Sequence, residues 1–203
     1  KKYYQSQGIG VLFTGSSGTG KTMAASILAN ALNLDLYRIE LSQIVSKYIG
    51  ETEKNLSKIF EAAEGSGVVL FFDEADALFG KRSETRDAHD RYANTEVSYL
   101  LQRIEEYGGL VILASNFRQN IDEAFVRRMR FIINFPFPDQ EMRKEIWEKA
   151  FPKDSPLEKD LNFSSLSEKF ALSGANIRNI ALFSAFFAIE QKDNIRMEHI
   201  IHG

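Results

Sequence analysis

Short apolar runs alternate with longer segments of helical periodicity over the first two thirds of the chain. Helices are expected over residues 23–32, 51–64 and 94–106; in the second, Leu56, Ile59, Phe60 and Ala63 form one apolar stripe. The apolar runs predict strands over residues 9–14, 34–41, 68–72, 110–114 and 131–135. Strands that alternate with helices favour an α/β fold with a mainly parallel five-stranded sheet, covered by helices on both faces.

The pattern changes at Pro136-Phe137-Pro138, beyond which only helices are expected. They cover residues 140–151, roughly 163–172 and 175–191, and a last helix begins near residue 196. We therefore expect an α/β domain over residues 1–138 and a small helical domain over residues 139–203. An apolar stripe in the third of these helices is interpreted as core of the helical domain, with an exposed contact between subunits as the alternative; it comprises Leu182, Phe183, Phe186 and Phe187.

Residues 15–22, Gly-Ser-Ser-Gly-Thr-Gly-Lys-Thr, match the phosphate-binding pattern G-x-x-x-x-G-K-[ST] between an expected strand and an expected helix. Glycines let the backbone approach phosphate oxygens, and the loop amides and helix N-terminus attract an anion. Lys21 is expected to reach the β- and γ-phosphates of ATP, and the Thr22 hydroxyl to ligate Mg²⁺. The expected contacts of ATP or ADP in this segment are Gly15, Ser16, Ser17, Gly18, Thr19, Gly20, Lys21, Thr22 and Met23.

Acidic residues follow the third expected strand. Asp73 is predicted to hold Mg²⁺, directly or through water, and to belong to the nucleotide site. Glu74 is predicted to deprotonate the water that attacks the γ-phosphate. For Asp76, a functional role and capping of the next segment are equally good interpretations. Asn116, after the fourth strand, is placed to bond the γ-phosphate or the attacking water, although an asparagine at a strand end is more often a turn residue.

Three further groups carry weaker signals. Arg127 and Arg128 can neutralise charge on a transferring phosphoryl group, whereas a basic helix face is the plainer interpretation. Tyr48, beside Gly50, suggests an exposed ring at a loop tip, and the alternative is a ring packed against the protein. Asp87-Ala-His89-Asp90 suggests a metal site, but a solvated charged loop is the better interpretation because the other histidines lie far away in sequence.

Composition narrows the classes of function. The chain has 203 residues, 44% of them apolar, a net charge of −3 and no cysteine. The acidic balance gives no electrostatic case for nucleic acid as a partner, and the absence of cysteine excludes thiolate metal sites. No apolar run approaches the length of a membrane span, so no membrane association is expected. A cytoplasmic location fits these features, and the missing initial methionine suggests an excised domain.

In this order, the phosphate loop, Ser46-Lys-Tyr-Ile-Gly-Glu51, Asp73-Glu-Ala-Asp76, Asn116 and Arg127-Arg128 closely resemble the AAA+ ATPases, and most of all their AAA subfamily. The resemblance implies a three-layer αβα P-loop NTPase fold with a helical lid, assembled as a homo-oligomeric ring that is usually a hexamer. It also implies that Asn116 is the sensor-1 residue. Arg127 and Arg128 would be arginine fingers that act on a neighbour's nucleotide.

At the pore-loop position, the resemblance implies that Tyr48 grips a polypeptide substrate, with Lys47 and Ile49 beside it. A narrower likeness lies in residues 77–84 and 87–94, which resemble AAA+ ATPases that accompany bacterial phage-tail-like contractile injection systems. We expect a ring-forming, ATP-hydrolysing motor that remodels or threads proteins. The alternative is an ATP-dependent scaffold or switch in which turnover is secondary, and a DNA-remodelling role is disfavoured by the acidic balance.

Overall fold

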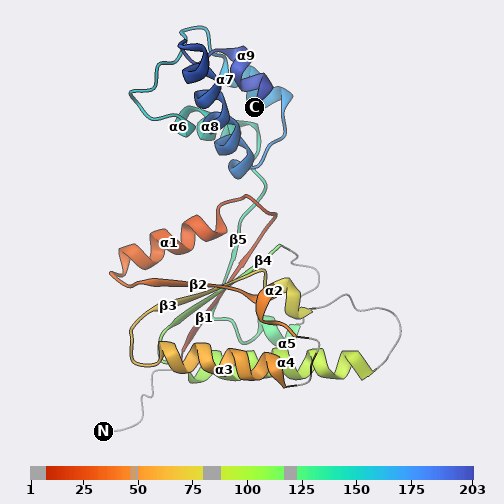
Figure 1. The fold of residues 1–203 in the computed structure, drawn as a ribbon. Coiled ribbons are helices and arrows are strands. Elements are labelled where there is room, and N and C mark those ends of the chain that lie inside the picture. The colour runs from red at the N-terminus through yellow and green to blue at the C-terminus, as the bar shows by residue number, and fades with distance from the viewer. Residues whose placement is uncertain (1–7, 47, 49, 80–87, 117–122) are drawn as a thin grey trace. The chain divides into compact units, whose positions relative to one another are not determined.

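The computed structural model describes residues 8–46, 48, 50–79, 88–116 and 123–203. It contains a five-stranded, wholly parallel sheet with strand order β2-β3-β4-β1-β5 (Figure 1). The strands are β1 (Ile9–Thr14), β2 (Leu36–Glu40), β3 (Val69–Asp73), β4 (Leu110–Ser115) and β5 (Phe131–Asn134). The predicted αβα class is confirmed.

Helices cover both faces of the sheet. Helix α1 (Lys21–Ala31) lies on one face, and α3 (Glu51–Ala63) and α4 (Ala88–Glu106) lie on the other (Figure 1). Strand β3 shows how the sequence builds both layers, because its side chains alternate between the faces. Val69 and Phe71 pack with α1, whereas Leu70 and Phe72 pack with α3 and α4. All four side chains are fully buried, which explains why this strand reads as a continuous apolar run.

Short elements connect these layers and refine the expected boundaries. They are α2 (Leu41–Ile44), the 3₁₀ helix η1 (Ala75–Phe79) and α5 (Glu123–Val126). The second strand ends at Glu40, its last residue paired with β3, and Leu41 turns into α2 with its side chain in the core. Helix α4 begins at Ala88, inside a stretch expected to be a charged loop. Charged residues are compatible with a helix, but they give no apolar periodicity by which to recognise one.

Residues 136–203, together with residues 16–20, form a second compact unit. Its helices are α6 (Gln140–Ala150), α7 (Phe163–Lys169), α8 (Gly174–Gln191) and α9 (Met197–His202). Trp147 of α6 is buried in the centre, stacked at 6.4 Å on the ring of Phe163. Three side chains of the right type cap helix starts, and Ser173, for example, accepts from the Asn176 amide at the start of α8. The independent folding implied by the expected boundary after residue 138 stays a prediction.

Helix α8 corrects one interpretation of the sequence. Its core-facing side consists mainly of small residues, among them Ala181, Ser184 and Ala188. The apolar stripe that was interpreted as core is instead exposed: Leu182 is 55% exposed, Phe183 51%, Phe186 60% and Phe187 37%. A helix that is apolar on all sides gives no periodic signal for which side is buried, and here the small side admits the closer packing.

No helix in the described part of the chain is long and apolar enough to cross a membrane.

Candidate functional site

The loop between β1 and α1 begins with a glycine that no other residue can replace without a clash. Gly15 has φ +144°, and a Cβ at this position would lie 2.1 Å from the carbonyl oxygen of Phe135. Its N–H donates to the Ser115 carbonyl at 3.2 Å, so the start of the loop is held against β4. Residues 16–20 pack with the helical unit, where the Ala175 N–H donates to the Gly18 carbonyl at 3.0 Å.

Lys21, the first residue of α1, is only 7% exposed. Its ammonium donates to the Gly15 carbonyl at 2.6 Å and to Oδ1 of Asn116 at 2.9 Å. Burial lowers the pKa of Lys21 below its ordinary value, and the nearby carboxylates of Asp73 and Asp76 partly oppose that shift. The fold therefore holds a desolvated cation at the carboxyl edge of the sheet, where an anionic phosphate would be favoured.

Two candidate Mg²⁺ ligands meet at the same edge. The Thr22 hydroxyl donates to Oδ2 of Asp73 over 3.5 Å, so a hydroxyl and a carboxylate oxygen lie side by side. This pair fits Mg²⁺, which takes oxygen ligands and usually keeps one or two protein ligands beside phosphates and waters. Arg38 of β2 also reaches Oδ2 of Asp73, at 2.8 Å. The sequence analysis missed Arg38, although a cation two residues from the end of a strand beside β3 was a usable signal.

Glu74 has an unusual backbone. Its φ is +55°, a left-handed conformation that non-glycine residues adopt rarely and at a cost of about 1–3 kcal/mol. Its amide donates to Oδ1 of Asp73 at 3.0 Å, and the residue is exposed. The turn after β3 therefore directs two consecutive carboxylates differently, with Asp73 half-buried beside Thr22 and Glu74 facing solvent.

Asn116 follows β4 and joins this cluster through two neighbours. Besides accepting from Lys21, it donates its backbone N–H to Oδ1 of Asp76 at 2.8 Å and its side-chain Nδ2 to Oδ2 of Asp76 at 3.4 Å. The structure thus brings together Lys21, Thr22, Asp73 and Asn116. It also resolves the open interpretation of Asp76, whose carboxylate holds the next strand's terminal residue.

The remaining predicted residues lie elsewhere. Arg127 and Arg128 precede β5 and are exposed, and Nε of Arg128 lies 3.6 Å from a carboxylate oxygen of Glu105. Tyr48 is 73% exposed, so its predicted exposure at a loop tip is confirmed. Lys47 and Ile49 lie outside the described residues, as does Asp87 of the possible metal site. Within the described residues, no cluster of three or more acidic, histidine or cysteine side chains could hold a metal.

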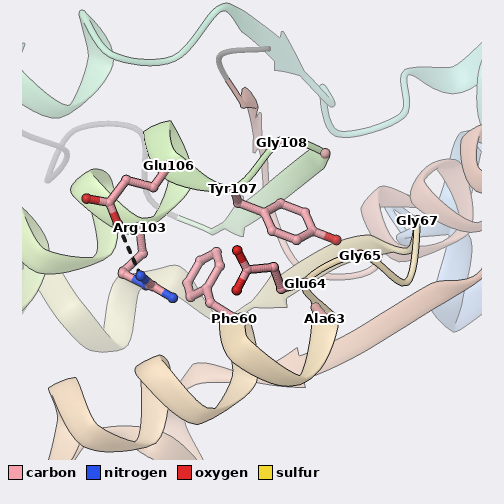
Figure 2. A pocket seen from close by; sticks show the side chains of 10 residues that line it. Phe60, Ala63, Glu64, Gly65, Gly67, Arg103, Glu106, Tyr107 and Gly108 are labelled. Atoms are coloured by element: carbon pink, nitrogen blue, oxygen red, sulfur yellow. Dashed lines mark hydrogen bonds and ion pairs between the residues drawn. The ribbon is translucent and has the colours of Figure 1, made fainter. Parts of the chain in front are cut away.

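A pocket of about 530 Å³ lies at the opposite edge of the sheet, between the ends of α3 and α4 (Figure 2). The Arg103 guanidinium lies 5.5 Å from the centre of the Phe60 ring, and the Tyr107 hydroxyl donates to the Val68 carbonyl at 2.8 Å. The lining carries both signs of charge, since Glu64 and Glu106 accompany Arg103. It contains none of the predicted site residues and defines no single class of ligand.

A parallel sheet with a glycine-rich loop, a buried lysine and a hydroxyl–carboxylate pair at its carboxyl edge defines the class of P-loop nucleotide hydrolases. Residues 11–138 match the "ATPase family associated with various cellular activities (AAA)". The chain belongs to this family and is an ATPase.

Curated relatives align with most of the chain. It is 32% identical over 201 residues to a proteasome-activating nucleotidase of Methanopyrus kandleri, covering 95% of this chain and 46% of the relative. It is 34% identical over 190 residues to a cell division cycle protein 48 homolog of Archaeoglobus fulgidus, covering 90% and 26%. It is 32% identical over 198 residues to an A-like p60 ATPase-containing katanin protein of Oryctolagus cuniculus, covering 91% and 40%. The chain therefore spans less than half the length of these relatives.

Proposed function

We propose that this chain is the ATP-hydrolysing module of a ring-forming motor that remodels or threads protein substrates. The observation that carries the proposal is the group of Lys21, Thr22, Asp73 and Asn116 at one edge of the sheet, with Glu74 next in the chain. Names of relatives support the protein-remodelling part, since they include a proteasome-activating nucleotidase and a katanin ATPase.

In the proposed reaction, the loop amides of residues 15–20 and the Lys21 ammonium bind the phosphates. Thr22 and Asp73 would hold Mg²⁺, which when bound offsets the negative charge that develops on the phosphates. Glu74 accepts a proton from a water molecule whose oxygen bonds to the γ-phosphorus. The bond from that phosphorus to the β–γ bridging oxygen breaks, and ADP and inorganic phosphate leave.

Arg127 and Arg128 support a shared site between subunits. In a parallel sheet, residues before β5 lie at its amino edge, whereas the phosphate loop follows β1 at the carboxyl edge. Strands of this length separate the two edges by roughly 13–20 Å. These arginines are therefore poorly placed to reach the nucleotide of their own chain, and we assign them to a neighbour's nucleotide.

Exposed apolar surfaces also support assembly. Each unit exposes such a surface: on β5 the side chains of Phe131 and Ile133 are 54% and 43% exposed, and on α8 those of Leu182, Phe183, Phe186 and Phe187 are uncovered. Monomers rarely leave large contiguous apolar patches in water. A homo-oligomeric ring, most simply a hexamer, would cover them.

Tyr48 is our candidate for substrate contact, with Lys47 and Ile49 as its neighbours in the chain. The exposed ring sits two residues before Gly50, whose φ of +80° turns the chain into α3. The Tyr48→Ala variant is expected to keep its basal ATPase rate and to lose remodelling of an unfolded polypeptide. Unchanged remodelling would remove Tyr48 from this role. The link to contractile injection systems rests on residues 77–94 alone and stays a prediction.

Replacement of Glu74 tests hydrolysis itself. The Glu74→Gln variant keeps the side-chain size but cannot accept the proton, so turnover should fall by about 10² to 10⁴-fold. Binding of a fluorescent ATP analogue should stay within about threefold of the wild type. Glu64→Gln, an equally exposed change at the opposite edge of the sheet, is the control and should leave both unchanged. Normal turnover in Glu74→Gln would favour a nucleotide-dependent scaffold instead.

A further inference from the structure

Asp76 is the acidic residue of the site to which the reaction above gives no task. It lies in η1, three residues after Asp73, and its two carboxylate oxygens take two hydrogen bonds from one residue. Oδ1 accepts the backbone N–H of Asn116 at 2.8 Å, and Oδ2 accepts the Asn116 side-chain NH₂ group at 3.4 Å. The carboxylate therefore contacts both the main chain and the side chain of Asn116.

These contacts determine which end of the Asn116 amide faces the phosphate loop. An ammonium can only donate hydrogen bonds, and an ionised carboxylate can only accept them. Lys21 lies 2.9 Å from Oδ1 and Asp76 lies 3.4 Å from Nδ2. Rotating the amide by 180° would place NH₂ against the ammonium and oxygen against the carboxylate, so both contacts would become repulsive. The oxygen therefore faces Lys21 and the catalytic edge.

We propose that Asp76 is a positioning residue that locks the Asn116 side chain with its carbonyl oxygen toward the reacting groups, so that Asn116 acts there as a hydrogen-bond acceptor. This inference rests on the proposed function and deepens it, because it gives the direction of the hydrogen bond that Asn116 makes. Asp76 itself need not touch the nucleotide.

The direction of that bond limits what Asn116 can contact. The terminal oxygens of an ionised γ-phosphate also accept hydrogen bonds only, so the amide oxygen would repel them. A water molecule, in contrast, has two protons to donate. If Glu74 takes one and Asn116 accepts the other, a lone pair of the water oxygen is directed at the γ-phosphorus. Such orientation is the effect by which positioned groups accelerate a bimolecular step.

The Asp76→Asn variant tests this lock. The new amide can still accept from the Asn116 backbone N–H, but its NH₂ would then meet the NH₂ of Asn116 and favour the rotated side chain. We expect kcat to fall by about 10- to 100-fold, with the KM for ATP within about threefold of the wild type. Asp35→Asn removes an exposed carboxylate at the start of β2 and should change neither value.

The same change in an Asn116→Ala background separates positioning from charge. Loss of the Asp76 charge acts on Lys21 in both backgrounds, whereas orientation of the amide matters only when Asn116 is present. The effect of Asp76→Asn on kcat should therefore shrink to less than about threefold in Asn116→Ala. A full and additive loss in the double variant would overturn the proposal, as would a wild-type kcat in Asp76→Asn.

A second readout does not depend on turnover. The side-chain NH₂ signal of Asn116, assigned by its disappearance in Asn116→Ala, should report a hydrogen-bonded group in wild-type protein and move in Asp76→Asn but not in Asp35→Asn. An unmoved signal would refute the lock even if the protein hydrolysed no ATP. Absence of hydrolysis in the wild type, together with a moved signal, would instead contradict the proposed function and leave the orientation standing.

Discussion

Replacing Lys21 with methionine should separate nucleotide binding from folding. The side chain is buried, and its ammonium donates to the Gly15 carbonyl and to Oδ1 of Asn116. Methionine has a similar length and no charge, so it fills the same space. It removes a cation whose burial is unfavourable, and it also leaves two acceptors without this donor.

The two effects on stability oppose each other. An unsatisfied acceptor costs about 1–3 kcal/mol, whereas replacing a buried charge with an apolar side chain is often neutral or stabilising by about 1–4 kcal/mol. We expect the free energy of unfolding to change by less than about 1.5 kcal/mol. ATP, in contrast, would lose charge-assisted hydrogen bonds of about 1.5–3 kcal/mol each. Two such bonds correspond to at least about 10²-fold in affinity.

The pKa of Lys21 adds a dependence on pH. Because burial lowers this pKa in the folded state from its ordinary value of 10.5, the unfolded chain binds more protons at this residue between the two values. The stability of the wild type relative to Lys21→Met therefore rises with pH in that interval and levels off near pH 10.5. Any advantage of the methionine variant should be largest near neutral pH.

Urea unfolding and titration with a fluorescent ADP analogue, each on the same preparation, measure both quantities. Lys58→Met, an exposed lysine of α3, is the matched control and should leave stability and binding unchanged. The reasoning fails if Lys21→Met binds nucleotide within about fivefold of the wild type. It also fails if the variant loses more than about 3 kcal/mol of stability, since Lys21 would then be a structural residue.

Two other arginine contacts give tests of their own. Arg38→Gln frees the Asp73 carboxylate, so the Mg²⁺ concentration for half-maximal nucleotide binding should fall by about two- to fivefold, the worth of an exposed ion pair; an unchanged or higher requirement would count against competition with the metal. Arg143→Gln removes hydrogen bonds of 2.7–3.0 Å to two backbone carbonyls and should destabilise the helical unit by about 2–4 kcal/mol in urea, followed by Trp147 fluorescence. Lys144→Gln on the same helix should cost less than about 0.5 kcal/mol, and equal effects would refute a specific role for Arg143.

Much of the α/β fold was predictable because its signals are local. Each buried strand appears as an apolar run, and the glycine-rich loop is a contiguous motif between a strand and a helix. Parallel strands share a carboxyl edge, so Asp73 and Asn116 could be placed near Lys21 from their positions after strands. The ordered pattern of motifs then identified the family, which the family match confirms.

Other features depend on contacts that no local pattern records. Asp76 is 40 residues from Asn116, and its role follows only from the order of β3 and β4 in the sheet. The Arg38–Asp73 ion pair likewise requires β2 and β3 to be neighbours in register. The exposed side of α8 was predicted wrongly because large apolar residues usually face the core, whereas the small face of this helix packs there.

The ATPase rate per protomer, measured as protein concentration rises, tests the central claim of hydrolysis at a shared interface most directly. The wild type is compared with Arg127→Ala and with Arg130→Ala, a neighbouring exposed arginine, as the control. The account predicts a rate that climbs with concentration in the wild type and in Arg130→Ala and that collapses in Arg127→Ala. A rate that is flat with concentration and equal in all three proteins would contradict it.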